Sequence, residues 1–225
     1  MKKFIVSALS VCSLLSCSPD EATIENTGTS RNTVQLKNIS PARNYANSFD
    51  YAGAFHSQLL DDYTHNYNSS TDLSAVINNV EAAAYEANFN SFMSDYNGLS
   101  IPYMAWVIDN TDNTQSIINA TDMSSYGKSV MLNFTVLLDT FENEKFDKIY
   151  TAIVSFESDI LNDQSLTNLD KQTILVTTST ARYSIYSNKG GPRGWTRTRA
   201  GIAASINDEM ALAVTSSVTA NIMAE

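Results

Sequence analysis

The order of apolar and polar residues predicts a chain that is almost entirely helical. In several stretches apolar side chains recur every three or four residues, which is the period of one helix face. The stretches with this spacing are 52–67, 73–87, 123–141, 146–160, 166–187 and 199–223. The apolar stretch 101–108 lacks the spacing and is expected to be a short strand or a buried connector. We therefore expect an all-α bundle of about six helices.

The first 46 residues differ from the rest of the chain. Residues 4–15 are mostly apolar and follow Lys2 and Lys3. Residues 18–46 have few large apolar side chains and many Ser, Thr, Asn and charged residues, a composition typical of a disordered linker. We expect a signal segment at 1–16, a cysteine and flexible tether at 17–46, and one helical domain at 47–225.

The signal segment is followed directly by a cysteine, in the order Leu14-Leu15-Ser16-Cys17. The apolar stretch is too short to cross a bilayer, which requires about 20 apolar residues. Leu-Leu-Ser-Cys resembles the lipobox of bacterial lipoproteins. The resemblance implies that Cys17 carries acyl chains such as palmitate and is the first residue of the mature chain. The alternative is an ordinary secretory signal that happens to end in a cysteine.

Charge and cysteine content argue against several classes of function. The net charge is -10, and loss of Lys2 and Lys3 with the signal would leave 12 basic against 24 acidic residues, or -12. Such an acidic chain is a poor partner for nucleic acid. Cys12 lies inside the signal, so the mature domain would have no thiol for a disulfide, a nucleophile or a metal ligand.

Histidine and acidic residues give no sign of a metal site. His56 and His65 are the only histidines, and nine residues at about 100° each place them on opposite faces of one helix. The acidic segment 109–113 lacks the later glycine and glutamate of a calcium-binding loop, so we expect a solvated loop there. We therefore expect neither a metal nor a cofactor.

The segment 47–61 combines polar, glycine and histidine positions at distinctive spacing. Its relevant residues are Asn47, Phe49, Asp50, Gly53, His56, Leu60 and Asp61. They resemble a motif of functionally unassigned lipoproteins of Bacteroidota, of the flavobacterial type, which reads roughly N-P-[YF]-D-x-x-G-x-x-H-N-x-x-L-D. Ser48 and Ser57 depart from that motif. The resemblance implies a lipidated, mostly helical envelope protein and carries no activity with it.

This motif has a structural and a catalytic interpretation. In the structural one, Asn47 caps a helix with Asp50 at its third position, Gly53 lets another backbone approach, and His56 is a core residue. In the catalytic one, His56 acts as a base that Asp50 or Asp61 orients. We favour the structural interpretation, because nothing in it requires a ligand.

The segment 189–199 gathers positive charge in an otherwise acidic chain, at Lys189, Arg193, Arg197 and Arg199 around Trp195. It is expected to be either an anion-binding site, with Trp195 supplying stacking area, or a glycine-rich loop whose arginines pair with acidic residues elsewhere. A lipid headgroup, an acidic glycan or a partner's carboxylates would be the anion. We favour the internal pairing, because acidic residues are in excess.

Together these features predict a lipid-anchored outer-membrane protein of the cell envelope without catalytic activity. Its expected contacts are the membrane, through the lipid, and an envelope protein or a glycan. Nucleic acid is not an expected partner. Two alternatives remain, an envelope hydrolase that uses His56 with Asp50 or Asp61, and an assembly or immunity-type partner protein.

Overall fold

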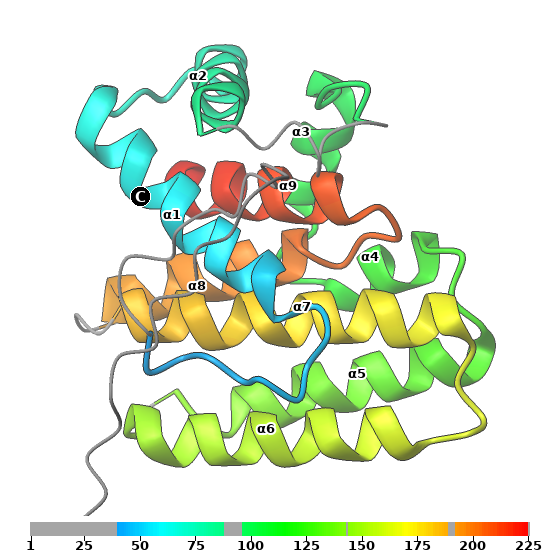
Figure 1. Cartoon of the computed structure of the whole chain (residues 1–225). Helices are drawn as coiled ribbons and strands as arrows, with labels where there is room; N and C mark the ends of the chain where they lie inside the picture. The colour runs from blue at the N-terminus through cyan, green and yellow to red at the C-terminus, as the bar shows by residue number, and fades with distance from the viewer. Residues whose placement is uncertain (1–39, 88–95, 143, 189–191, 225) are drawn as a thin grey trace, which may run out of the picture. The chain divides into compact units, whose positions relative to one another are not determined.

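The structure, a computed structural model, describes residues 40–87, 96–142, 144–188 and 192–224. These residues form helices and no strand, which confirms the predicted all-α fold (Figure 1). The helices are α1 (Asp50–Asn66), α2 (Leu73–Glu86), α3 (Ile101–Asp109), α4 (Thr114–Ala120), α5 (Ser125–Asp139), α6 (Phe146–Asn162), α7 (Asn168–Ser187), α8 (Pro192–Ala204) and α9 (Met210–Met223). The expected signal segment, Cys17 and the tether as far as residue 39 lie outside the described residues.

The described part of the chain has nine helices rather than about six, for three reasons. The stretch expected to be a strand or connector is α3, whose Pro102 lies in the first turn, where a helix needs no backbone donor. Helix α4 has too few apolar positions to show a period. The single helix expected at 199–223 is two, because the polar segment 205–209 ends α8, and the Asn207 side chain accepts a hydrogen bond from the Glu209 N–H at 2.8 Å.

The packed domain also begins earlier than the predicted residue 47. Ala42 is fully buried and Asn44 is 8% exposed, so both belong to the domain rather than to a tether. The Asn44 side chain donates to the carboxylate of the buried Glu157 at 2.7 Å. Composition alone cannot reveal this, because the segment packs through polar groups instead of an apolar stripe.

Helix α7 is the central element of the domain (Figure 1). It packs against α1, α6, α8 and α9, and it contributes to two apolar cores. Its Ile174 and Leu175 belong to a core formed mainly by α3 to α6 and α8. Its Val176 belongs to a second core formed by α1, α2 and α9. The position of α7 therefore fixes the two halves of the helical domain against each other.

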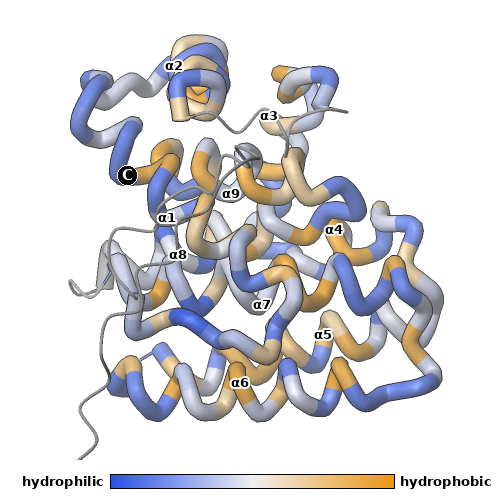
Figure 2. The backbone as a smooth tube through the Cα atoms, in the orientation of Figure 1, coloured by the Kyte–Doolittle hydropathy of each residue, from blue (hydrophilic) through white to orange (hydrophobic). Residues whose placement is uncertain are grey.

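Although α7 is buried, Figure 2 shows much of it as pale or blue rather than orange. Its fully buried polar residues include Thr173, Thr177, Thr178, Ser179, Thr180 and Ser184. Several of these hydroxyls bond to backbone carbonyls, such as Thr177 to Ser205 of the α8–α9 connection at 3.1 Å. Short side chains of this kind can bond to nearby backbone and leave room for neighbouring helices to come close, although Thr180 Oγ1 has no hydrogen-bond partner among the described residues.

Helices α1 and α7 approach each other closely at Gly53. A Cβ atom at Gly53 would lie 2.5 Å from the Ser179 backbone oxygen, so only glycine fits there. The Gly53 N–H donates to Ser179 Oγ at 2.9 Å, and that hydroxyl donates to the Asp50 carbonyl at 3.0 Å. The structure thus contains the close backbone approach that the motif predicts for Gly53.

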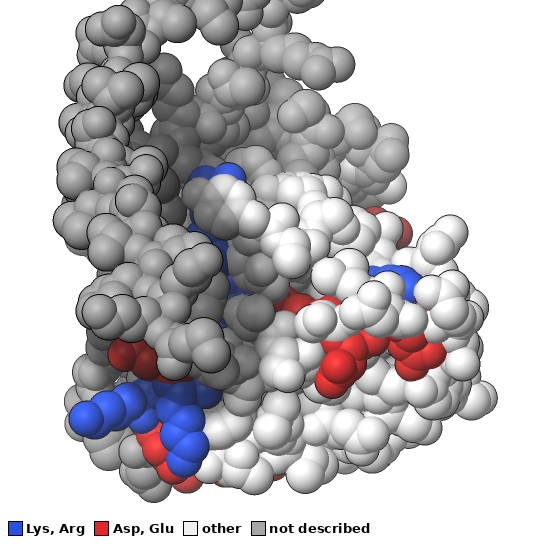
Figure 3. All heavy atoms as spheres, turned by 60° about the horizontal axis from the view of Figure 1, so that its bottom comes forward, with Lys and Arg blue, Asp and Glu red and all other residues white. Residues whose placement is uncertain are grey.

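The described surface gives no broad basic area on the side that Figure 3 presents. There, basic side chains lie beside acidic ones in small groups, and the rest of the described surface is largely uncharged. None of the helices described above has both the length and the apolar character to cross a membrane.

Candidate functional site

The first candidate site, the motif at 47–61, contributes to a buried group of charges. We call Arg182, Asp50 and Glu157 the ion cluster. The Arg182 side chain is fully buried, and its Nη2 donates to Asp50 Oδ1 at 2.6 Å while its Nε donates to Glu157 Oε1 at 3.1 Å. It also donates to the Ala42 carbonyl. The cluster joins the start of α1 to the C-terminal halves of α6 and α7.

Polar neighbours complete the hydrogen bonding of both carboxylates. Glu157 accepts from the side-chain amides of Asn44 and Asn47 at 2.7 and 2.8 Å, and from Thr178 Oγ1 at 2.8 Å. Tyr183 donates its hydroxyl to Asp50 at 3.1 Å. Burial and the Asp50 charge raise the pKa of Tyr183, so the hydroxyl keeps the proton it donates. A cluster this fully bonded stabilises the fold and leaves no carboxylate poised for chemistry.

The structure corrects the predicted role of Asn47. Helix α1 begins at Asp50, with Phe49 as its N-cap residue, so Asp50 holds the first helical position and not the third. Asn47 Oδ1 accepts from the Phe49 N–H at 2.8 Å, just before the helix. The Asn47 amide nitrogen bonds to Glu157 and to the Leu175 carbonyl, so contacts with α6 and α7 determine where Asn47 lies.

His56 is enclosed in the core, as the structural interpretation of the motif expects. Its side chain is fully buried, and neither ring nitrogen has a hydrogen-bond partner among the described residues. Burial lowers the pKa of His56 to about 4, so the ring is neutral at physiological pH. Asp50 is engaged by Arg182, and Asp61 follows five residues later, about 140° around the helix. The structure therefore brings neither carboxylate to the imidazole.

Of the residues predicted as an anion site, Trp195, Arg197 and Arg199 are described, and they do not converge, because they lie on α8 and not on a loop. Trp195 is half-buried against the larger core, and Arg199 pairs with Asp139 of α5 at 3.2 Å. Arg197, two residues before Arg199, lines a pocket on another side of α8. The side chain of Arg193, and Lys189 as a whole, lie outside the described part of the chain. Side chains two positions apart on a helix point in different directions, and this separates Arg197 from Arg199.

Residues 40–87, 96–142, 144–188 and 192–224 contain no cluster of three or more His, Cys, Asp or Glu side chains that could hold a metal ion. His65 is exposed, and its Nδ1 lies 2.7 Å from the backbone oxygen of Asp61. In the acidic segment 109–113, Asp109 is the last residue of α3 and residues 110–113 form the turn to α4.

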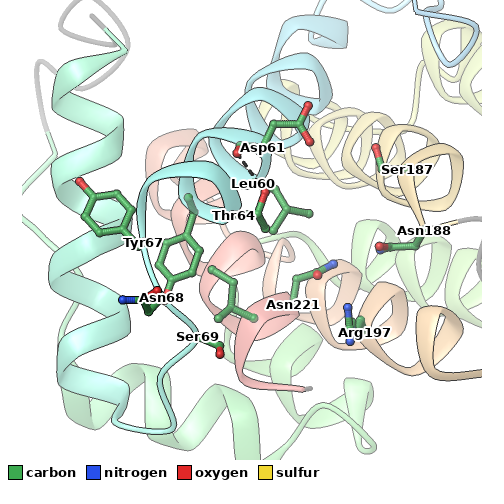
Figure 4. Close-up of a pocket in the computed structure, with 12 residues that line it drawn as sticks. Leu60, Asp61, Thr64, Tyr67, Asn68, Ser69, Ser187, Asn188, Arg197 and Asn221 are labelled. Carbon is green, nitrogen blue, oxygen red and sulfur yellow. Dashed lines mark hydrogen bonds between the residues drawn. The ribbon is translucent and has the colours of Figure 1, made fainter.

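A pocket of about 440 Å³ opens near the C-terminal end of α1 (Figure 4). Its lining comes from α1, the α1–α2 connection, the end of α7, α8 and α9. Tyr63, Asn221 and Ile222 form its buried part, and Tyr67, Asn188 and Arg197 are half-buried. The exposed rim consists of Asp61, Thr64, Asn68, Ser69 and Ser187. Apart from Asp61 and the stripe residue Leu60, the motif contributes nothing to it.

Asn221 is the unusual residue of this pocket. It is 3% exposed, and its side-chain nitrogen makes no hydrogen bond with the described residues. A buried amide donor without a partner costs about 1–3 kcal/mol, so its presence in a pocket wall indicates a ligand or water that accepts from it. Gly201 of α8 packs beside this residue, and a Cβ atom there would come closest to Ser217 of α9, at 3.1 Å from its backbone oxygen.

The pocket carries charge of both signs. Arg197 brings a guanidinium from α8, and Asp61 brings a carboxylate from α1. Partial burial raises the pKa of Asp61, with a further rise from Asp62 and an opposing effect from His65. Tyr67 offers an aromatic ring that stacks on Tyr63 with 5.5 Å between ring centroids. Sequence reasoning missed this site because its residues come from five segments with no shared pattern.

Comparison with known proteins assigns no family to this chain. No family model matches it, and no curated protein and no solved structure is similar to it. The assignment of a functional site therefore rests on the geometry of the pocket.

We expect Glu157→Gln to destabilise the domain strongly, by about 3–5 kcal/mol, because it leaves the Arg182 charge buried with incomplete compensation. Urea unfolding followed by far-ultraviolet circular dichroism measures the change. Glu144→Gln is the matched control, since Glu144 pairs with Lys148 on the surface and its loss should cost about 0.5 kcal/mol or less. Equal effects of the two substitutions would contradict the role given to the ion cluster.

His56 should make the fold sensitive to mild acid. Its pKa is about 4 when folded and about 6.5 when unfolded, so its neutral form is favoured by the fold. The contribution of His56 to the free energy of unfolding is then fully present above pH 6.5, and it is lost progressively as the pH falls towards 4. Between pH 7 and 5 we expect a loss of about 2 kcal/mol from this residue. The loss should be absent in His56→Leu and unchanged in His65→Gln, in urea titrations at each pH.

Proposed function

We propose that this chain is a lipid-anchored envelope protein that binds a small polar molecule in the pocket between α1, α8 and α9. The observation that carries the proposal is the unpartnered, buried amide of Asn221 in the wall of that pocket. The pocket volume of about 440 Å³ is in the range of small-molecule sites, roughly 300–1,000 Å³. The function proposed is binding without catalysis.

The anchor rests on the first 17 residues. A basic start, a short apolar stretch and Leu14-Leu15-Ser16-Cys17 are together typical of a lipoprotein signal. Two or more acyl chains on Cys17 would hold the protein stably at a membrane, whereas one chain binds only marginally. The proposed location is the outer membrane, with the lipid as the membrane contact and the pocket free for an envelope component.

The absence of a catalytic role is supported by what surrounds the reactive side chains. His56 is enclosed and has no carboxylate partner, so a substrate has no route to it through the described residues. In the pocket, Asp61 has no histidine ring among the lining residues to act with. Arginine and amide donors bind and orient a ligand, but neither is an ordinary acid or base near neutral pH.

Replacement of the anchor residue tests the first half of the proposal. Cys17→Ala should give a precursor that takes up no labelled palmitate and no longer sediments with the outer membrane, because acyl transfer requires the thiol. Cys12→Ala is the control, since Cys12 lies within the signal and should leave both labelling and location unchanged. Normal labelling of Cys17→Ala would contradict the anchor.

A ligand screen tests the second half. The melting temperature of the full chain in detergent, measured across a library of sugars, sugar acids, amino acids and other small polar metabolites, should rise with at least one compound, because ligand binding to the folded state stabilises it. Tyr67→Ala should remove that shift, and Tyr85→Ala, an exposed tyrosine outside the pocket, should retain it. If no compound shifts the parent, or if both variants respond alike, the pocket is not a binding site.

A further inference from the structure

Helix α3 is apolar on all sides, although only one side of it is packed against the domain. Residues 101–108 contain no charged residue and no Ser, Thr, Asn or Gln. Met104 and Val107 are buried in the larger core. A helix that is apolar all round is ordinarily enclosed by protein or by lipid, whereas a helix at a water-exposed surface has a polar outer side. That polar outer side is missing from α3.

The exposed side of α3 is one continuous apolar surface. Ile101 is 47% and Trp106 is 37% exposed, Pro102 is exposed, and Ala105 is half-buried. At about 100° per residue, these four positions fall within one arc of about 140° around the helix axis. Asp109, the last residue of α3, lies in the same arc. A single carboxylate therefore bounds this surface at the C-terminal end of the helix.

The small size of this surface argues against a stable protein partner. A helix of nine residues is about 14 Å long, so one side of it offers far less than the roughly 800 Å² per partner of a stable protein interface. A second copy of this chain would meet the same limit. The exposed side of α3 therefore suits an occupant that another attachment already holds close to it.

The proposed lipid anchor provides such an attachment. Acyl chains on Cys17 would keep the domain beside a bilayer, where even a weak apolar contact forms because the local concentration of lipid is high. Residues 18–39 can span at most about 3.5 Å each, or roughly 80 Å, which exceeds what one side of a domain of this size needs to reach the lipid. The anchor alone would therefore not select which side of the domain faces the membrane.

The chemistry of the exposed side of α3 fits a lipid surface. Tryptophan is favoured at the membrane interface, where its ring is among apolar groups and its N–H reaches polar ones. The uncharged stretch 101–108 also avoids the repulsion that an anionic lipid surface exerts on a chain with a net charge of -10. Figure 1 shows α3 with α2 at one edge of the domain, away from α6, where a flat surface can reach it.

We propose that the exposed side of α3 docks on the bilayer to which the chain is anchored, with Ile101 and Trp106 entering the interface. This proposal rests on the lipid anchor of the proposed function and adds a second membrane contact to it. The contact determines which side of the domain faces the lipid. No residue of α3 lines the pocket, so docking does not occupy the pocket.

The two tryptophans of the chain allow a direct test. The acylated chain is reconstituted into phosphatidylcholine vesicles with or without bromine on the lipid acyl chains, since bromine quenches only a tryptophan that it contacts. Trp195→Phe leaves Trp106 as the only tryptophan, and Trp106→Phe leaves Trp195. Trp106 should lose most of its emission in brominated vesicles. Trp195, half-buried against the larger core, should keep its emission.

A matched pair of substitutions in the Trp195→Phe chain tests the apolar contact. Ile101→Asp should abolish the quenching of Trp106, because a carboxylate at this place would have to leave water on docking. An acidic residue in the first turn is favourable to a helix, so α3 should stay folded. Val136→Asp is the control, since it changes a 57% exposed apolar residue of α5 and should leave the quenching unchanged. Circular dichroism checks the fold of each variant.

Flotation of the protein with the vesicles in a density gradient separates the two possible failures. If the protein floats but Trp106 is quenched no more than Trp195, or if Ile101→Asp and Val136→Asp have equal effects, α3 does not dock on the bilayer and the anchor stands. If the protein does not float with the vesicles, the anchor and the docking proposal both fail.

Discussion

The arrangement of the helices depends on one buried arginine. Removing a guanidinium from water costs several kcal/mol unless opposite charge and hydrogen bonds replace the lost hydration. Arg182 receives that compensation from Asp50 at the start of α1 and from Glu157 in α6, 132 and 25 residues away in the chain. Only one register of α1 and α6 along α7 provides both carboxylates at once. The ion cluster therefore specifies how three helices align, which apolar packing alone would leave less determined.

A third carboxylate has a comparable role at the other end of α7. Asp170 forms a capping box with Thr167 at the start of the helix, and its two oxygens also accept from the backbone and hydroxyl of Ser124, the N-cap residue of α5. Burial opposes ionisation of Asp170, but these hydrogen bonds outweigh it and lower the pKa of its carboxyl. Gly127 of α5 leaves space for the Asp170 side chain. Thus polar contacts at both ends of α7 set its position, and the apolar residues between them fill the two cores.

The spacing of apolar residues predicted the class of fold, the long amphipathic helices and the burial of His56, because each depends on residues three or four positions apart. It missed α3 and α4, where a short apolar run has no room to show a period. It also missed Arg182 and Glu157 as partners of Asp50, since an arginine in a Thr-rich stretch gives no sign that it is buried. The sequence did not predict the pocket either. Asp61 and Arg197 belong to two separate sequence features, and no pattern around Asn221 distinguishes it.

The motif at 47–61 connects the ion cluster to the pocket. Asp50 begins α1 in the ion cluster, and Asp61 lies eleven residues later at the pocket rim, about 16 Å along the helix axis. Between them Gly53 holds α1 against Ser179, and His56 fills the core with neither ring nitrogen hydrogen-bonded to the described residues. Because α1 is a continuous helix, the alignment that Arg182 sets at Asp50 also determines the position of Asp61. A motif made largely of structural residues can in this way determine where the α1 wall of the pocket stands relative to Arg197 and Asn221.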